Sequence, residues 1–551
     1  MRAITLRVAC AFAALALPAL AAAQDDGSYD EPGEETASGS THSEVVPYIE
    51  VDQIFTQQLE PFDDFVTYTT VAAGVDATIV GNNSMASASL RYERRIDWGD
   101  DGVGGDTISG LARAGVQLTP GLTLEAGGLA TQTRVEGNGA ATLAGFAGVD
   151  DSTSQLYSVF AGPSFHAMDG DVELEGHYRF GYTALEEPDA VLLVPGEEAV
   201  DYFDDSTTHD AYARVGVRPN TIAPIGVGVG GGFVQQDISN LDQRILDAHL
   251  RADVTVPVSP NLAFAGGIGY EDVEVSSRDA VRDANGDPII GNDGRYITDE
   301  NAPRRIAYAT EGLIWDVGVL WRPSRRTSLE AYVGERYGDV NFHGSFSYAP
   351  NDHASVSAFA YDTISGFGGL ALNQLAGLSS DFEAFRNPIT GEIGGCVATT
   401  GGNGCFANAL GSLNSAVFRS RGIGASMSVD IGRTQFGAGG GYDRRTFIAA
   451  QDTVLEDFDG LSDETVWYAA YASTQIDQVS SLSANLYTSW FESGFNRSSD
   501  VVGYSASLAY YRDILDGLTG TAAVGLDGVS RENLPDFMSV SGLLGLRYSF
   551  H

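Results

Sequence analysis

The stretch Met538 to Phe550, M-S-V-S-G-L-L-G-L-R-Y-S-F, decides the fold. Successive side chains of an extended chain point to opposite faces, and one face here is apolar: Val540, Gly542, Leu544, Leu546, Tyr548 and Phe550. The opposite face is small or polar apart from Leu543: Ser539, Ser541, Gly545, Arg547 and Ser549. The pattern predicts a β-strand with one apolar face. If that face meets lipid, Arg547 points into an aqueous lumen, because a lipid-facing arginine at the bilayer midplane costs about 2–4 kcal/mol.

The end of this strand carries a second signal. The pattern Gly545-x-x-Tyr548-x-Phe550 resembles the C-terminal signal by which outer-membrane β-barrel proteins are recognised for insertion. Leu543 replaces the polar residue that is usual two positions before the glycine, and His551 follows the final aromatic residue. The resemblance implies the barrel-assembly machinery as a partner, together with outer-membrane lipid and lipopolysaccharide.

The N-terminus predicts export. Arg2 and Arg7 precede an apolar run from Val8 to Leu20, and Ala21-Ala22-Ala23 before Gln24 reads as a cleavage site. We therefore expect a signal peptide over residues 1–23. No later stretch approaches the roughly 18 uninterrupted apolar residues of a membrane-spanning helix, but a closed β-barrel can cross a membrane without one.

Residues 24–44 are acidic and rich in Gly, Ser and Thr. This composition predicts a flexible periplasmic lead-in. It is too short for the plug domain of well over a hundred residues that TonB-dependent transporters carry before their barrel. We expect residues 45–551 to form the barrel itself.

Turn signals divide that region. Ten short connections are rich in Gly, Pro, Asn, Asp or Ser, the residues that favour tight turns: 81–83, 119–121, 169–170, 218–220, 259–261, 322–324, 350–352, 432–433, 477–478 and 516–517. Longer connections alternate with them, near 57–64, 98–106, 135–152, 186–210, 236–243, 271–305, 338–340, 363–414, 449–463, 493–500 and 530–536. The alternation predicts an all-β fold, a transmembrane antiparallel up-and-down barrel of about 22 strands, within a range of 18–24. An even number leaves both termini in the periplasm.

Composition agrees with a large folded envelope protein. The chain of 551 residues contains no lysine, and without Arg2 and Arg7 its 29 remaining arginines stand against 74 acidic residues, a formal charge of −45. Such acidity argues against nucleic-acid binding, which needs basic patches. Most of the acids are expected to be solvated loop charge. A soluble all-β protein would explain the strand alternation, but not the signal peptide, the C-terminal ending and the loop alternation together.

The stretch Arg322 to Gly338, R-P-S-R-R-T-S-L-E-A-Y-V-G-E-R-Y-G, resembles a segment of outer-membrane β-barrel proteins associated with PEP-CTERM/exosortase and exopolysaccharide systems. In that family a W-R-P-S turn is followed by an aromatic strand rich in Gly and Arg. The next hairpin, residues 341–361, is similar too. The resemblance implies a barrel that works beside surface-polysaccharide or protein-sorting machinery, and it supplies no catalytic residues.

The longest connection, 363–414, contains apolar residues at near-helical spacing: Leu375, Leu378, Phe382 and Phe385. We expect a short helix that folds into the barrel mouth as a constriction. A solvated extracellular flap is an equal alternative, and a cap against the lipid headgroups is a third. Cys396 and Cys405 lie in the same connection, and in an oxidising compartment we expect them to form a disulfide worth roughly 2–3 kcal/mol of local constraint.

A weak calcium candidate lies in connection 271–305. Asp283, Asn285 and Asp287 have the spacing of a calcium-binding loop, but Pro288 and Gly294 occupy the positions where an EF-hand needs Gly and Glu. We expect no other cofactor.

The sequence predicts no enzyme, because it lacks a Gly-x-Ser-x-Gly elbow, a His-Glu-x-x-His motif and a P-loop. Two function classes remain. One is a cation-preferring pore whose lumen carboxylates set its selectivity, linked to export of surface polysaccharide or protein. The other is a plugged structural or assembly barrel that binds partners through its large extracellular loops.

Overall fold

The structure is a computed structural model that describes residues 41–98, 105–135, 141–142, 153–186, 205–221, 223–292, 294–351, 353–399, 402–405, 416–494, 500–532 and 535–550. The predicted signal peptide and residues 24–40 of the lead-in lie outside these ranges. Among the described residues, no helix is long and apolar enough to cross a membrane.

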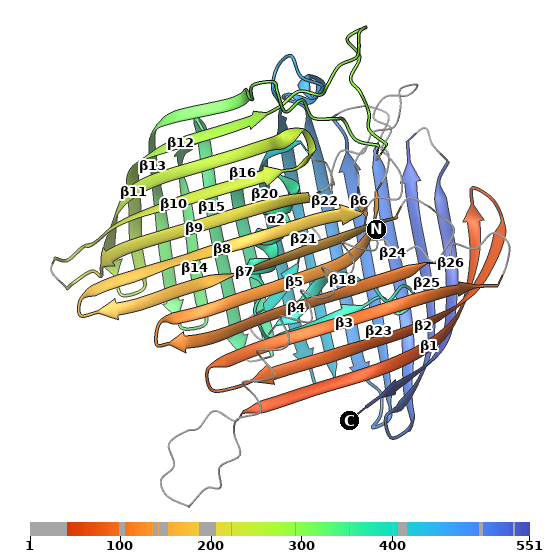
Figure 1. Ribbon diagram of the computed structural model, residues 1–551. Coiled ribbons are helices and arrows are strands. Elements are labelled where there is room, and N and C mark those ends of the chain that lie inside the picture. Colours follow the sequence, from red (N-terminus) through yellow and green to blue (C-terminus); the bar gives the residue numbers. More distant parts are fainter. Residues whose placement is uncertain are drawn as a thin grey trace, which may run out of the picture.

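Twenty-two antiparallel strands form one closed ring (Figure 1). They are β1 (His42–Glu60), β2 (Asp64–Val80), β3 (Ser84–Asp97), β4 (Asp106–Thr119), β5 (Leu122–Val135), β7 (Thr153–Asp169), β8 (Val172–Glu186), β9 (Asp205–Val217), β10 (Gly226–Ile238), β11 (Gln243–Ser259), β12 (Leu262–Ser277), β13 (Arg305–Ser324), β14 (Thr327–Arg336), β15 (Asp339–Asn351), β16 (Ala354–Ser365), β20 (Val417–Ile431), β21 (Thr434–Ile448), β22 (Ser462–Gln475), β23 (Ser480–Glu492), β24 (Val501–Leu515), β25 (Leu518–Arg531) and β26 (Phe537–Ser549). The short β6 (Ala141–Thr142) pairs with the end of β5.

The last strand closes the ring on the first. β26 pairs antiparallel with β1 from Tyr48↔Ser549 to Gln58↔Ser539. β1 begins and β26 ends at the same end of the barrel, which also carries the tight turns (Figure 1). The predicted all-β, 22-stranded, up-and-down barrel is confirmed.

Eight of the ten predicted tight turns lie at short connections between strands as expected. The turn predicted at 322–324 lies instead at 325–326, because β13 extends to Ser324, and the β9–β10 connection is longer and spans 218–225. Two connections predicted as longer ones are short. β1 and β2 are separated only by 61–63, and β14 and β15 only by Tyr337 and Gly338. The last two residues both have positive φ, 58° and 65°, as a two-residue type I′ hairpin turn requires.

The two faces of each strand differ as the alternation predicts. On β26, Leu544 is 62% exposed on the outside, whereas Ser541 is 1% exposed on the inside. Arg547 lies on the inner face, where Nη2 donates to Asp76 Oδ2 at 2.6 Å. Leu313 of β13 and Leu486 of β23 are likewise exposed outward. An apolar belt therefore surrounds a polar interior, as a barrel in lipid requires.

Leu544→Arg tests this assignment. An arginine at mid-strand on the lipid face should destabilise the folded barrel in lipid vesicles by about 2–4 kcal/mol. Urea titration followed by gel mobility measures the change. The matched variant is Ser345→Arg, whose position pairs with Glu330 on the lumen face of β15. If both variants unfold at the same urea concentration, Leu544 does not face lipid.

Candidate functional site

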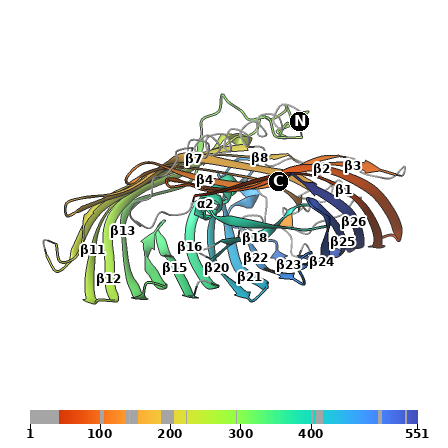
Figure 2. The same cartoon turned by 90° about the horizontal axis from the view of Figure 1, so that it is seen from below.

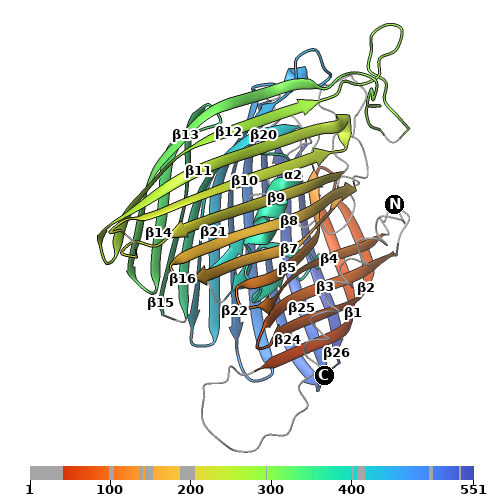
Figure 3. The same ribbon diagram turned by 60° about the vertical axis from the view of Figure 1, so that its left-hand side comes forward.

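The connection between β16 and β20 folds into the barrel. It contains helix α2 (Phe367–Gly377) and a small antiparallel sheet of β17 (Phe382–Arg386), β18 (Ile393–Thr399) and β19 (Gly402–Cys405). Figure 2 shows α2 and β18 between opposite walls of the ring, and Figure 3 shows α2 inside it. We call residues 366–416 the lumen insert.

Helix α2 packs against the inner faces of β5, β7, β8 and β9. Its buried side chains Leu372 and Leu375 join a cluster with Leu129, Leu156 and Leu185 of that wall. A Cβ at Gly181 would lie 1.7 Å from Leu372 Cδ1, so only glycine lets the helix approach β8 this closely. The start of the insert is held too, because the backbone N–H of Gly366 donates to Gln236 Oε1 of β10 at 2.9 Å.

The C-terminus of α2 is bound by Arg113 of β4. Its guanidinium donates to the carbonyls of Leu378 at 3.2 Å and Ala376 at 3.3 Å. It also pairs with Glu125 at 2.9 Å. A cation at this end satisfies free helix carbonyls and complements the helix dipole.

Arg386, at the end of β17, attaches the insert to β3 and β4. It donates from Nη1 to Ser109 Oγ at 2.8 Å and from Nη2 to the carbonyl of Ser89 at 2.9 Å. It also donates to the carbonyl of Gly391 at 2.7 Å, which fixes the turn that follows β17.

The turn after β17 places Ile389 against the ring at its closure. Ile389 packs into a buried cluster with Ile54 of β1 and Leu543 of β26, whose other members are Val66, Tyr68, Ala509 and Ala523. A Cβ at Gly525 would lie 2.9 Å from Ile389 Cγ1. This contact explains why an apolar residue stands at 543 on the lumen face of β26: Leu543 is 3% exposed because the insert covers it.

Glu392 joins the same turn to β5. Its Oε2 accepts from the backbone N–H of Gln132 at 3.0 Å and from Thr131 Oγ1 at 3.1 Å. Its Oε1 is buried and has no hydrogen-bond partner in the described part of the chain. Burial raises the pKa of Glu392 to about 7.

The four predicted constriction residues all lie in the insert, but not on one helix. Leu375 belongs to α2, Leu378 is the residue after it, and Phe382 and Phe385 lie in β17. The helix predicted around these residues is wrong in its limits, because α2 ends at Gly377. Ser379 donates to Asp381, a local side-chain bond typical of segments that leave a helix. Phe385 stacks on Tyr471 of β22, with ring centroids 3.9 Å apart.

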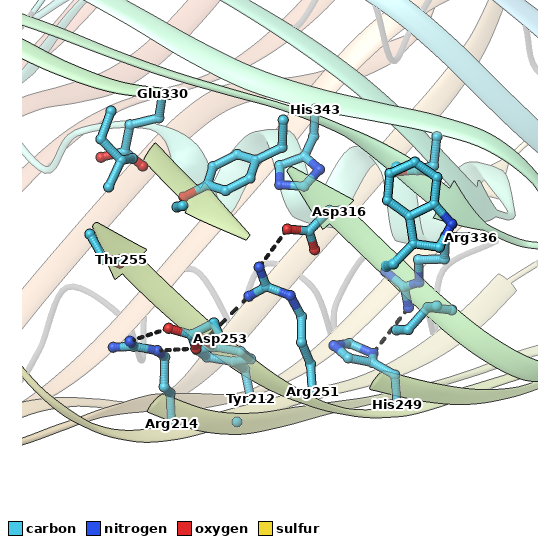
Figure 4. Close-up of a pocket in the computed structure, with 18 of the residues that line it drawn as sticks. Tyr212, Arg214, His249, Arg251, Asp253, Thr255, Asp316, Glu330, Arg336 and His343 are labelled. Atoms are coloured by element: carbon cyan, nitrogen blue, oxygen red, sulfur yellow. Dashed lines mark hydrogen bonds and ion pairs between the residues drawn. The ribbon is translucent and has the colours of Figure 1, made fainter. Parts of the chain in front are cut away.

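Beside the insert, the inner wall formed by β8–β16 encloses a cavity of about 1050 Å³ (Figure 4). Its lining extends from Arg218 and Arg322 near the tight turns to Tyr337. Alternating charges cross its floor. Arg214 of β9 forms a bidentate pair with Asp253 of β11, at 2.9 and 2.7 Å.

The row of charges continues to the next strands. Arg251 of β11 donates to Asp316 of β13 at 2.6 Å. Farther from the tight turns, Arg336 donates to Asp247 at 2.7 Å and to Glu271 at 3.3 Å. Paired guanidinium and carboxylate groups therefore line the floor.

Glycines make these pairs geometrically feasible, because each arginine crosses an intervening strand. A Cβ at Gly228 of β10 would lie 2.5 Å from Arg214 Nη2, and one at Gly267 of β12 would lie 2.2 Å from Arg251 Nε. The sequence analysis missed this cavity. The available signal was G-V-G-V-G-G-G from Gly226 to Gly232, which puts glycine at the first four inward positions of β10.

The other predicted site residues stay apart from the cavity. Cys396 and Cys405 are directly opposite each other in the pairing of β18 with β19. Asp283 Oδ1 accepts from the backbone N–H groups of Asn285 and Asp287, which lowers the pKa of Asp283. Within the described ranges, no group of three or more His, Cys, Asp or Glu residues is arranged to hold a metal ion, and the calcium site stays a prediction.

No protein-family model matches the chain, and no curated protein matches it. Several solved structures are similar to it at low identity. The FrpB iron transporter from Neisseria meningitidis (F3-3 variant) is 11% identical, with 92% of this chain and 81% of that chain covered and a TM-score of 0.42. The ferric-catecholate import receptor Fiu from E. coli K12 is 10% identical, with 91% and 81% covered and a TM-score of 0.42. The siderophore receptor PiuA from Acinetobacter baumannii is 8% identical, with 94% and 82% covered and a TM-score of 0.39.

The pKa of Glu392 predicts that insert docking depends on pH. A carboxyl whose pKa is raised by folding stabilises the docked insert at low pH, and this contribution is lost as pH rises through about 7. We expect deuterium exchange at residues 387–392 to increase from pH 6 to pH 8, after correction for the intrinsic exchange rate. Glu392→Gln should remove most of this increase. An equal increase in the variant would show that another group controls docking.

The register of β18 and β19 supports the predicted disulfide, since opposite Cα atoms in antiparallel strands lie within the range that a disulfide spans. Protein purified from the envelope and alkylated without reductant should carry no adduct on Cys396 or Cys405. The same sample should carry two adducts after reduction. Alkylation before reduction would contradict the bond.

Proposed function

We propose that this chain is a plugged transport barrel of the bacterial outer membrane. The lumen insert is the plug, and the cavity beside it is the part of the lumen open to solute. One observation carries the proposal: the insert leaves β16 and returns at β20, two adjacent strands, yet it is bound to wall strands across the lumen.

The contacts of the insert are those of a plug. Arg113, Arg386 and Glu392 make polar contacts between the insert and β3–β5, and Ile389 covers apolar side chains at the β1–β26 closure. The covalent links lie only at β16 and β20, so the insert can leave the far wall without breaking the ring. Release of the turn at 387–392 then requires the loss of a few hydrogen bonds and of the Ile389 contact, whereas release of α2 would also expose the apolar cluster around Leu372 and Leu375.

The membrane and the orientation belong to the same proposal. Closed barrels with an even strand number are the architecture of bacterial outer-membrane proteins. β1 begins and β26 ends at the tight-turn end, where outer-membrane barrels have their short periplasmic turns. We therefore place both termini in the periplasm and the long connections outside the cell.

We expect the cation preference of the pore to be weak. Of the carboxylates that line the cavity, Glu335 and Asp362 bind partners on the outer face, Trp315 and Arg419. Five lining acids and five lining arginines remain: Glu173, Glu175, Asp253, Asp316 and Glu330 against Arg214, Arg218, Arg251, Arg322 and Arg336. Arg336 is in addition bound to Asp247 and Glu271, which do not line the cavity. The acid excess of the whole chain therefore does not extend to this cavity.

A partner-binding role in surface-polysaccharide or protein export is the second candidate, and it needs no enzymatic activity. The long connections 278–304 and 449–461 interlock, because Asp279 Oδ1 accepts from the backbone N–H of Val454 and Arg305 pairs with Asp452. Tyr296, Leu455 and Phe458 pack in one cluster between them. A fixed outer surface of this kind suits a protein or polysaccharide partner.

Arg386→Ala tests the plug. Loss of the bonds to Ser89 and Ser109 should loosen the insert, so that single channels in planar bilayers open more often than in the unchanged protein. Deletion of 366–412 should give a larger and permanently open conductance. The reversal potential under a salt gradient should show only weak cation preference.

Arg444→Ala is the matched control, because Arg444 lies on the outer face of β21 and pairs with Glu464 at 3.7 Å. Its channel record should equal that of the unchanged protein. Unchanged conductance in the folded deletion variant would refute the plug and favour the partner-binding barrel.

A further inference from the structure

We propose that the lumen cavity binds a neutral, polyhydroxylated solute, of which a short oligosaccharide is the simplest example. The inference rests on the proposed transport function, since it names the class of solute that would occupy the lumen beside the insert. It is carried by three features of the lining: balanced charge, unused hydrogen-bonding atoms, and aromatic rings on the same wall.

Balanced charge disfavours ions of either sign. Asp253 accepts hydrogen bonds from both Nε and Nη2 of Arg214, and Asp316 accepts one from Nη2 of Arg251. An anionic solute would have to compete with these carboxylates, and a cationic solute with the guanidinium groups. A neutral solute can bind while every arginine–carboxylate pair stays intact, so its binding does not lose the free energy of a broken ion pair.

The pairs still offer hydrogen bonds. Nη1 of Arg214 approaches Glu175 Oε1 only to 3.5 Å, and Oδ2 of Asp316 accepts no hydrogen bond from any residue the structure describes. Donors and acceptors thus alternate along the floor of the cavity (Figure 4). Sugar hydroxyls both donate and accept, so adjacent hydroxyls match such a row better than a purely anionic or cationic group does.

Aromatic rings complete the lining. Tyr212 lies beside Arg214 on β9, and Tyr332 of β14 stacks with His343 at 4.8 Å and 12°. The apolar C–H face of a sugar ring packs on aromatic rings. Because the first four inward positions of β10 are glycine, the cavity reaches about 1050 Å³, just above the roughly 300–1,000 Å³ of small-molecule pockets. It has room for more than one sugar ring.

The test uses three trisaccharides of similar size and different charge, titrated calorimetrically into the full chain in detergent. These are neutral maltotriose, anionic trigalacturonate and cationic chitosan trimer. We expect maltotriose to bind at least about tenfold tighter than either charged sugar, the ratio that a difference of about 1.4 kcal/mol gives. Equal or tighter binding of a charged trimer, or no binding of any of the three, would overturn the proposal.

Two variants locate the site. Tyr212→Ala should weaken maltotriose binding about fivefold, in line with the loss of one aromatic contact. Tyr178→Ala is its matched control, because Tyr178 lies on the neighbouring strand but is 41% exposed on the outer face. Asp316→Asn should leave Arg251 with only its 3.9 Å approach to Asp253 and raise the affinity for trigalacturonate about tenfold.

The binding measurement is independent of the plug. If maltotriose binds as expected but deletion of 366–412 leaves conductance unchanged, the cavity is a sugar site in a barrel that does not transport. If conductance rises but none of the sugars binds, the plug stands and the sugar assignment is wrong.

Discussion

Closure of the backbone hydrogen-bond ladder is the constraint on which the rest of the molecule depends. An unpaired N–H or C=O group in hydrocarbon costs several kcal/mol, so a sheet can cross lipid only when its first and last strands pair. The pairing of β1 with β26 fulfils this requirement. Once the ring is closed, the period-2 geometry of each strand fixes one face toward lipid and the other toward the lumen. Leu544 and Arg547, three residues apart, therefore face different environments: Leu544 faces lipid and Arg547 faces the lumen.

Closure creates two different inner walls. At β1, β2 and β24–β26 the lumen face contains apolar residues such as Ile54 and Leu543, and the insert covers them. Along β9–β14 the lumen face combines glycines with paired arginines and carboxylates, and a cavity remains. The insert therefore docks where burial of apolar surface is favourable. The insert leaves uncovered the wall where charged groups would be costly to bury.

The attachment of the insert is uneven in strength. Helix α2 is embedded in an apolar cluster, whereas the turn at 387–392 depends on Ile389, Arg386 and Glu392. A carboxyl that is buried with one oxygen unbonded is a weak point in an otherwise satisfied contact. We therefore expect the turn to be the part of the insert that a change in protonation moves first. The cavity lies on the wall that the insert leaves uncovered.

The sequence alone determined the architecture, because strand alternation and turn chemistry are local properties. Leu544, Arg547 and the turn residues of eight hairpins lie where their pattern predicts, and the strand number follows from the alternation of turns and loops. The Tyr337-Gly338 turn was misjudged, since its length depends on which residues adopt positive φ. The sequence predicted a helical insert in the right connection but placed the helix around the wrong residues. Phe382 and Phe385 lie in β17, which pairs with β18 and does not extend α2. Only the tertiary structure explained why Leu543 is apolar, because the side chain that covers it, Ile389, lies 154 positions away in the chain. Only the tertiary structure showed why Gly228 and Gly267 are glycines, since they let the side chains of Arg214 and Arg251 cross a neighbouring strand to reach their carboxylate partners. Such contacts join residues that are distant in sequence, and no local pattern specifies them.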